Sequence, residues 1–88
     1  MQLEWDEAKR LATIAKHGVD FRDLERFKWH EALAFPPQVI EGETRWREIG
    51  PLDDRLVYVV YTEREDRTRI ISARVATKLE KKLYVENA

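Results

Sequence analysis

Apolar residues recur with a helical period near the start of the chain. Those spaced as one helix face are Ala8, Leu11, Ala12 and Ala15. Asp6 is a suitable N-cap, and Gly18 tolerates the positive φ that often follows a last helical turn. The pattern therefore predicts a helix within residues 6–18, after a short extended segment at residues 3–5.

A second short helix is predicted directly after the first. In the segment VDFRDLERF, Asp20 is the expected N-cap. Val19 and Leu24 occupy the N′ and N4 positions of a hydrophobic staple, which fixes how the chain enters a helix. Two short helices joined by a tight turn should therefore open the domain.

Short extended runs follow from residue 32 onward. A strand in the segment ALAFP is expected to stop at Pro36 and Pro37, because proline has no N–H to donate to a neighbouring strand. The segment PLDD has the composition of a hairpin turn, and EREDRTR forms the next connection. Three further strands are expected, at residues 44–50, 55–63 and 70–75.

A capping box marks the start of a last helix. Thr77 and Glu80 have the required spacing in the segment TKLE, so this helix is predicted to begin at Lys78. Residues 1–88 should therefore form a single α+β domain. We expect two N-terminal helices, a small antiparallel sheet of about four strands and a C-terminal helix.

The last predicted hairpin determines which side chains share a face. If Glu63 lies opposite Ile70, antiparallel pairing places Tyr61 opposite Ser72. Arg74 then lies on the same face as Tyr61 and Ser72. The opposite face, which is expected to receive the helices, holds Leu56, Tyr58, Val60, Ile71, Ala73 and Val75.

Composition narrows the classes of function. Sixteen basic residues against seventeen acidic ones give a net charge of −1, so any phosphate binding needs a local basic patch. The chain has no cysteine, so a zinc site would need His17, His30 and carboxylates, and we expect no metal or cofactor. No segment resembles a signal peptide or membrane span, so a soluble, cytoplasmic protein is expected.

Arg74 is the residue that the strand pattern explains least, because it interrupts an apolar run. It is either a structural charge paired with Glu80 or a forked guanidinium that binds phosphate. Lys16 and His17 end the first predicted helix, where the helix dipole favours cations, and His17 can also exchange a proton near neutral pH. The sequence leaves both interpretations open for each residue.

Arginines are frequent in the strand half of the chain. Arg45, Arg64 and Arg74 are expected to form a local basic patch if the strands bring them to one face. Groups of this kind can cleave RNA without a metal, because RNA supplies its own nucleophile in the 2′-hydroxyl. The protein then provides a base, an acid and cations that stabilise the charged transition state.

Four segments carry a resemblance to a known family. WDEAKRLATIAKHGVDF, ETRWREIG, VVYTER and RIISARVATKLEKKLY, in this order and spacing, resemble the BrnT toxin family. The resemblance implies a RelE-like fold and a ribonuclease toxin of a type II toxin–antitoxin system that arrests translation. It also implies a BrnA-type antitoxin, binding of operator DNA only through that antitoxin, and leaves open a dimer within the complex.

For this activity we expect Arg74 to be the main stabiliser of the transition state. Phosphate contacts are assigned to Arg64, Arg45 and Lys16. Tyr61 and His17 compete for the acid and base roles, and Glu80 either orients Arg74 or acts as the base. The alternative is a non-catalytic protein-binding or regulatory module of the same fold. The two differ in whether Tyr61, Arg74 and a proton carrier share one surface.

Overall fold

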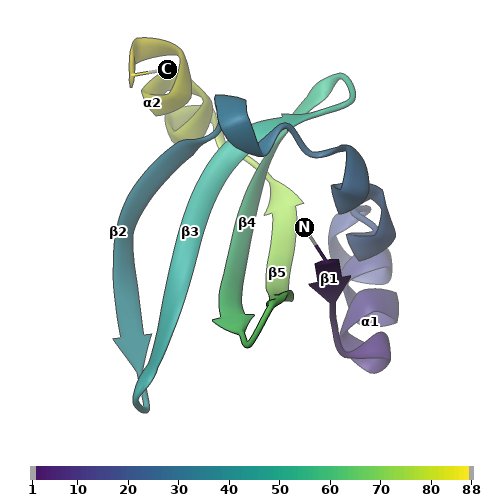
Figure 1. The fold of residues 1–88 in the computed structure, drawn as a ribbon. Helices are drawn as coiled ribbons and strands as arrows, with labels where there is room; N and C mark the ends of the chain where they lie inside the picture. The colour runs from purple at the N-terminus through teal and green to yellow at the C-terminus, as the bar shows by residue number, and fades with distance from the viewer. Residues whose placement is uncertain (1, 88) are drawn as a thin grey trace.

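The computed structural model describes residues 2–87 and has the α+β architecture that the sequence predicts (Figure 1). Its elements are β1 (Gln2–Glu4), α1 (Glu7–His17), the 3₁₀ helices η1 (Phe21–Arg26) and η2 (Trp29–Glu31), β2 (Leu33–Ile40), β3 (Glu43–Leu52), β4 (Arg55–Arg64), β5 (Arg67–Val75) and α2 (Lys78–Asn87). Among these residues no helix is long and apolar enough to cross a membrane.

The sheet differs from the predicted antiparallel sheet of about four strands. Over the described residues it has five strands, in the order β1-β5-β4-β3-β2. Strands β2 to β5 pair in antiparallel fashion, but β1 pairs in parallel with β5. The expected extended segment at the start of the chain therefore belongs to the sheet and covers one end of its β5 edge.

Both α-helices begin where their capping residues predict. The Asp6 carboxylate accepts a hydrogen bond from the Lys9 N–H at 3.0 Å, and Gly18 ends α1 with a φ of 68°. In α2 the capping box is complete. The Glu80 N–H donates to the Thr77 hydroxyl at 3.2 Å, and the Thr77 N–H donates to the Glu80 carboxylate at 2.8 Å.

The second predicted helix is a 3₁₀ helix rather than an α-helix. Asp20 caps it as expected, accepting from the Arg22 N–H at 2.9 Å. Phe21, Leu24 and Phe27 are all buried and recur every three residues, which matches the turn of a 3₁₀ helix better than that of an α-helix. The tighter winding directs all three side chains into the core.

The strand predicted to stop at the two prolines continues through both of them. β2 is the edge strand beyond β3, so one side of its backbone needs no partner. The register with β3 shifts between Phe35 and Gln38, which leaves Pro36 and Pro37 outside the regular pairing. Edge position and irregular pairing together explain why proline is tolerated here.

The predicted register of the last hairpin is wrong. Tyr61 pairs with Ile70 and Tyr58 pairs with Arg74. A shift between Val60 and Tyr61 leaves Ile71 as an extra residue in β5, so the face assignment reverses along the strand. The predicted sharing of one face by Tyr61 and Arg74 is therefore wrong as well.

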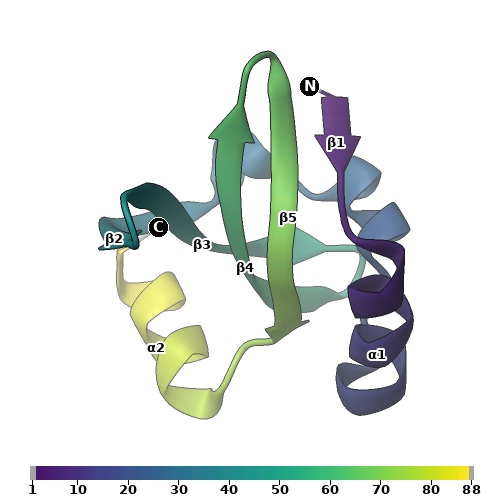
Figure 2. The same cartoon turned by 90° about the horizontal axis from the view of Figure 1, so that it is seen from below.

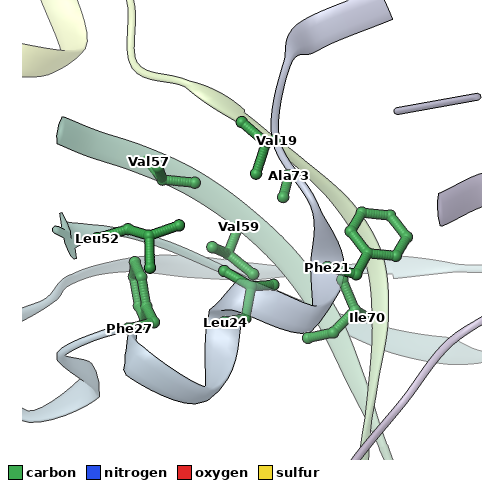
Figure 3. Close-up of a cluster of buried hydrophobic side chains, with 9 residues drawn as sticks. All are labelled: Val19, Phe21, Leu24, Phe27, Leu52, Val57, Val59, Ile70 and Ala73. Carbon is green, nitrogen blue, oxygen red and sulfur yellow. The ribbon is translucent and has the colours of Figure 1, made fainter. Parts of the chain in front are cut away.

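One face of the sheet packs against the segment around η1 and carries the main core (Figure 3). From that segment come Val19, Phe21, Leu24 and Phe27, and from the strands come Leu52, Val57, Val59, Ile70 and Ala73. We call this side the core face. The other side, here called the open face, carries Phe35, Arg47, Tyr58, Val60, Ser72 and Arg74 on successive strands.

Gly50 is expected to be intolerant of substitution. A Cβ at this position would lie 2.7 Å from Phe27 Cζ and 3.0 Å from Ala32 Cβ. Gly50→Ala should therefore lower the free energy of unfolding by about 1–3 kcal/mol, measured by chemical denaturation. Adding Phe27→Leu, which removes the clashing ring, should recover part of that loss. A Gly50→Ala protein as stable as the wild type would contradict this account.

Candidate functional site

The open face of the sheet lies between the two α-helices. Figure 2 shows β4 and β5 in the foreground, with α1 beside β5 below the short strand β1 and α2 on the other side. On this face Tyr58, Val60, Ser72 and Arg74 are half-buried, whereas Ile49, the β3 partner of Tyr58, is fully buried. Polar and aromatic groups on this face therefore remain accessible to a ligand.

Arg74 and Glu80 form an ion pair, which is one of the two interpretations that the sequence leaves open for Arg74. Arg74 Nη1 lies 2.7 Å from Glu80 Oε1, and Nη2 lies 2.9 Å from Oε2. These bonds hold the pKa of the Glu80 carboxyl below its ordinary value, although burial acts in the opposite direction. Glu80 also accepts from the Thr77 N–H. This geometry fits Glu80 as the group that orients Arg74 better than as a base.

The pair leaves part of the Arg74 guanidinium available. Its Nε–H and the second hydrogen of Nη2 have no protein acceptor within residues 2–87. These two hydrogens point along the same edge of the guanidinium plane, which is the geometry that binds a phosphate with two hydrogen bonds. The guanidinium carbon lies 4.5 Å from the centre of the Tyr58 ring. Arg74 is therefore held between Glu80 and Tyr58 with one edge free.

A cationic groove separates α1 from β5 beside this pair. It has a volume of about 230 Å³ and is lined by Lys9, Ala12, Thr13, Lys16, His17, Ile71 and Ser72. No carboxylate lines it, and Lys9, Lys16 and His17 form no ion pair within the described part of the chain. Ser72 is two residues from Arg74 on the same face of β5. Arg74 does not line the groove, but it lies about 7 Å along β5 from Ser72 at the edge of the groove.

Tyr61 lies on the core face, away from Arg74. Its ring packs edge-on against Trp29, with 5.2 Å between the ring centres, and its hydroxyl donates to Glu48. Burial, reinforced by the bond to Glu48, raises the pKa of the Tyr61 phenol. The structure thus brings Lys16, His17, Arg74 and Glu80 to one side of the sheet, but not Tyr61.

Arg45 and Arg64 lie at the far end of the open face. Both contact Glu43, at 3.5 Å and 3.0 Å, and the hydrogen bond from Arg64 is the main reason that the pKa of Glu43 is lowered. In β4, Arg64 is six residues beyond Tyr58, the partner of Arg74, which corresponds to about 20 Å. The expected single basic patch is therefore split into two separate groups.

Several contributors to this surface were missed by the sequence reasoning. Tyr58 and Arg47 lie on the open face because of the observed strand register, which the sequence does not reveal. Lys9 could have been identified, because it lies seven residues before Lys16 and therefore on the same face of the helix. Arg10 is buried and bonds Glu7 and Asp20, which ties α1 to η1 and holds one wall of the groove. The i, i+3 spacing of Glu7 and Arg10 was the available signal.

The three tryptophans and His30 do not line the groove. Trp5 and Trp29 pack against the core, while Trp46 is 38% exposed on the core face. His30 is exposed beside Glu31. Within residues 2–87 no three His, Asp or Glu side chains are grouped as metal ligands. The open face and its groove are therefore the candidate site.

Comparison with known proteins identifies the family of the chain. A search of curated proteins finds no significant match. The model of a family described as "Ribonuclease toxin, BrnT, of type II toxin-antitoxin system" matches residues 5–80, which include the groove, the open face and both partners of the Arg74–Glu80 pair. The chain therefore belongs to the BrnT family of ribonuclease toxins from type II toxin–antitoxin systems.

Proposed function

We propose that this chain cleaves RNA without a metal ion, at the groove between α1 and β5. The observation that supports the proposal is that a groove lined by a histidine, two lysines and Ser72 ends two residues along β5 from the oriented guanidinium of Arg74, on the same face of the strand. These are the groups that metal-free phosphoryl transfer from a 2′-hydroxyl needs.

In the proposed reaction the scissile phosphate occupies the groove. Lys16 and the free edge of Arg74 contact its oxygens and stabilise the charge of the transition state. His17 takes the proton of the 2′-hydroxyl as that oxygen attacks phosphorus. The bond from phosphorus to the 5′ oxygen breaks, and the leaving oxygen takes a proton from solvent. The products are a 2′,3′-cyclic phosphate and a 5′-hydroxyl.

The remaining sequence candidates take secondary roles in this proposal. Glu80 orients Arg74, and Arg45 and Arg64 contact phosphates further along the strand. Tyr61, on the core face, holds Glu48 and Trp29 in place. Two observations favour the non-catalytic alternative. Tyr61 does not share a face with Arg74, and Arg74, Arg45 and Arg64 each contact a carboxylate of the same chain.

The family suggests a cellular role. We propose that RNA cleavage in the cytoplasm arrests translation, and that a BrnA-type antitoxin neutralises the toxin by covering the open face. Operator DNA would be bound only through that antitoxin, within a complex that can contain two toxin copies. An acidic or amphipathic segment of the antitoxin would complement the cations of the groove.

The proposed chemistry is tested with two matched oligonucleotides in excess chelator. We expect the purified protein to cleave a single-stranded RNA and to leave 2′,3′-cyclic phosphate ends, which mass spectrometry detects. The same sequence with 2′-O-methyl groups should remain intact because the nucleophile is blocked. Cleavage that requires added Mg²⁺, or that also occurs in the methylated strand, would contradict the mechanism. Binding of RNA without any cleavage would favour the non-catalytic alternative.

A further inference from the structure

Two aromatic rings and two guanidinium groups lie together on the open face, outside the groove. The rings of Phe35 and Tyr58 are 6.4 Å apart between centres and inclined by 42°. The guanidinium carbon of Arg47 lies 5.9 Å from the Phe35 ring centre, and that of Arg74 lies 4.5 Å from the Tyr58 ring centre. We call these four residues the aromatic–arginine cluster.

The main core does not need this cluster. None of its members belongs to the buried core or to the residues packed against it, and all four are half-buried on the open face. Arg47 is held in place because its Nη2 donates to the Pro36 carbonyl at 2.8 Å. Its Nε is buried and has no hydrogen-bond partner among the described residues. The cluster is therefore held in place by the protein without being part of the main core.

The positive charge of the cluster is not sufficient to identify the ligand that it fits. Glu80 offsets the charge of Arg74, so Arg47 supplies most of the local positive charge. The rest of the cluster consists of two flat aromatic rings, and a guanidinium plane lies near each ring. Flat, uncharged rings stack on such surfaces, and nucleobases are ligands of this kind.

We propose that the aromatic–arginine cluster binds an unpaired nucleobase of single-stranded RNA, next to the phosphate that is cleaved. This inference rests on the proposed RNA cleavage. Phe35 and Ser72 lie in the same row across the sheet, through Arg47 and Val60. Three strand spacings separate them, which is about 14 Å. A base at the cluster therefore belongs to a nucleotide that flanks the one in the groove.

Single-stranded RNA is the substrate class that this arrangement selects. In a duplex both faces of each base are stacked on neighbours, so a base reaches an aromatic side chain only when it is unpaired. Stacking also tolerates different sequences, because every base offers a π face. The cluster should thus favour loops and ends over duplexes without requiring one particular base.

Binding is measured separately from cleavage with a fluorescent 2′-O-methyl oligonucleotide, which lacks the nucleophile. Tyr58→Leu and Phe35→Leu should each raise the Kd by about tenfold, because leucine preserves an apolar contact but not base stacking. Tyr58→Phe should bind like the wild type, since it keeps the ring. Trp46→Leu is the matched control and should leave the Kd unchanged, because Trp46 is a partly exposed aromatic residue on the core face. Melting temperatures show whether each variant is folded.

Salt concentration separates stacking from charge. Phosphate contacts weaken as salt rises because they release counterions, whereas stacking does not. The ratio of Kd values between Tyr58→Leu and the wild type should therefore persist at high salt. An equal loss in Trp46→Leu, a ratio that disappears at high salt, or equal affinity for duplex RNA would each overturn the inference. So would a Tyr58→Leu variant that loses only binding of the antitoxin.

The two proposals fail in different ways. If the wild type binds the oligonucleotide in a Tyr58-dependent manner but cleaves no RNA, the nucleobase site stands and the proposed chemistry is wrong. If RNA is cleaved but binding does not depend on Phe35 or Tyr58, the chemistry stands and the nucleobase site is wrong.

Discussion

Replacing His17 with alanine is expected to lower the rate of RNA cleavage by about 10²–10⁴-fold, the usual contribution of a positioned acid or base. The melting temperature should change little, because His17 is exposed at the end of α1 and makes no ion pair within the described residues. The rate is measured in single-turnover reactions, so that slow product release does not hide the chemical step.

The matched control is His30→Ala. His30 is the other histidine of the chain, its side chain is 81% exposed, and it lies beside Glu31 rather than in the groove. This variant should cleave RNA at the wild-type rate. Equal losses in both variants, or a fully active His17→Ala protein, would remove His17 from the catalytic site. Partial recovery of His17→Ala by added imidazole would support proton transfer over a packing role.

Local signals along the sequence were sufficient for the elements whose geometry is determined by near neighbours. Asp6 and Gly18 define the ends of α1, and the capping box of Thr77 and Glu80 defines the start of α2. The Arg74–Glu80 pair was also predictable, because six residues separate its partners and the capping box fixes one of them. These features depend on hydrogen bonds within a few residues of each other.

The pairing between strands was harder to predict from the sequence. The extra residue at Ile71 shifts the register of β5 against β4, and a shift of one residue moves every later side chain to the other face. Tyr61 was therefore assigned to the open face instead of Tyr58. The strand through Pro36 and Pro37 was missed because a proline is acceptable only at an edge, and edge position is a property of the whole sheet.

Only part of the groove was predictable, because some of its residues are identified by local sequence and others by how distant segments pack together. Lys16 and His17 were candidates because of their helix-end position, which is local. Their proximity to Ser72 depends on how α1 lies against β5, which the Arg10 contacts to Glu7 and Asp20 help to determine. The sequence thus suggested candidate groups for the site but not the set of residues that meet around the groove.

Arg74→Lys is expected to lower the cleavage rate by about 10²–10³-fold, as for loss of one oriented donor at the transition state. An ammonium group cannot bind Glu80 and a phosphate through two parallel pairs of hydrogen bonds, so one of the two partners loses its contact. This variant also weakens the link between β5 and α2. A loss of activity alone therefore does not distinguish a catalytic role from a structural one.

Glu80→Gln separates these roles. Glutamine keeps the capping box of α2 but removes the charge that pairs with Arg74. The pair is partly exposed and should contribute about 1 kcal/mol, so the melting temperature should fall by about 4–8 °C. Because the pKa of Glu80 is lower when folded than when unfolded, the pair stabilises the protein above the unfolded value of about 4.3. The difference from the wild type should therefore shrink as the pH falls through the lowered folded value.

The comparison of the two variants decides the role of Arg74. If Arg74 contacts the phosphate, Glu80→Gln should lose stability to a similar degree as Arg74→Lys but keep most of its cleavage rate. The guanidinium remains in this variant, and the glutamine amide oxygen can still accept one hydrogen bond that orients it. Similar losses of activity in both variants would mean that the ion pair acts by holding α2 against the sheet. Arg74→Lys protein that melts early yet cleaves at the wild-type rate would remove Arg74 from the catalytic groups, and the groove of Lys9, Lys16 and His17 would have to stabilise the transition state without it.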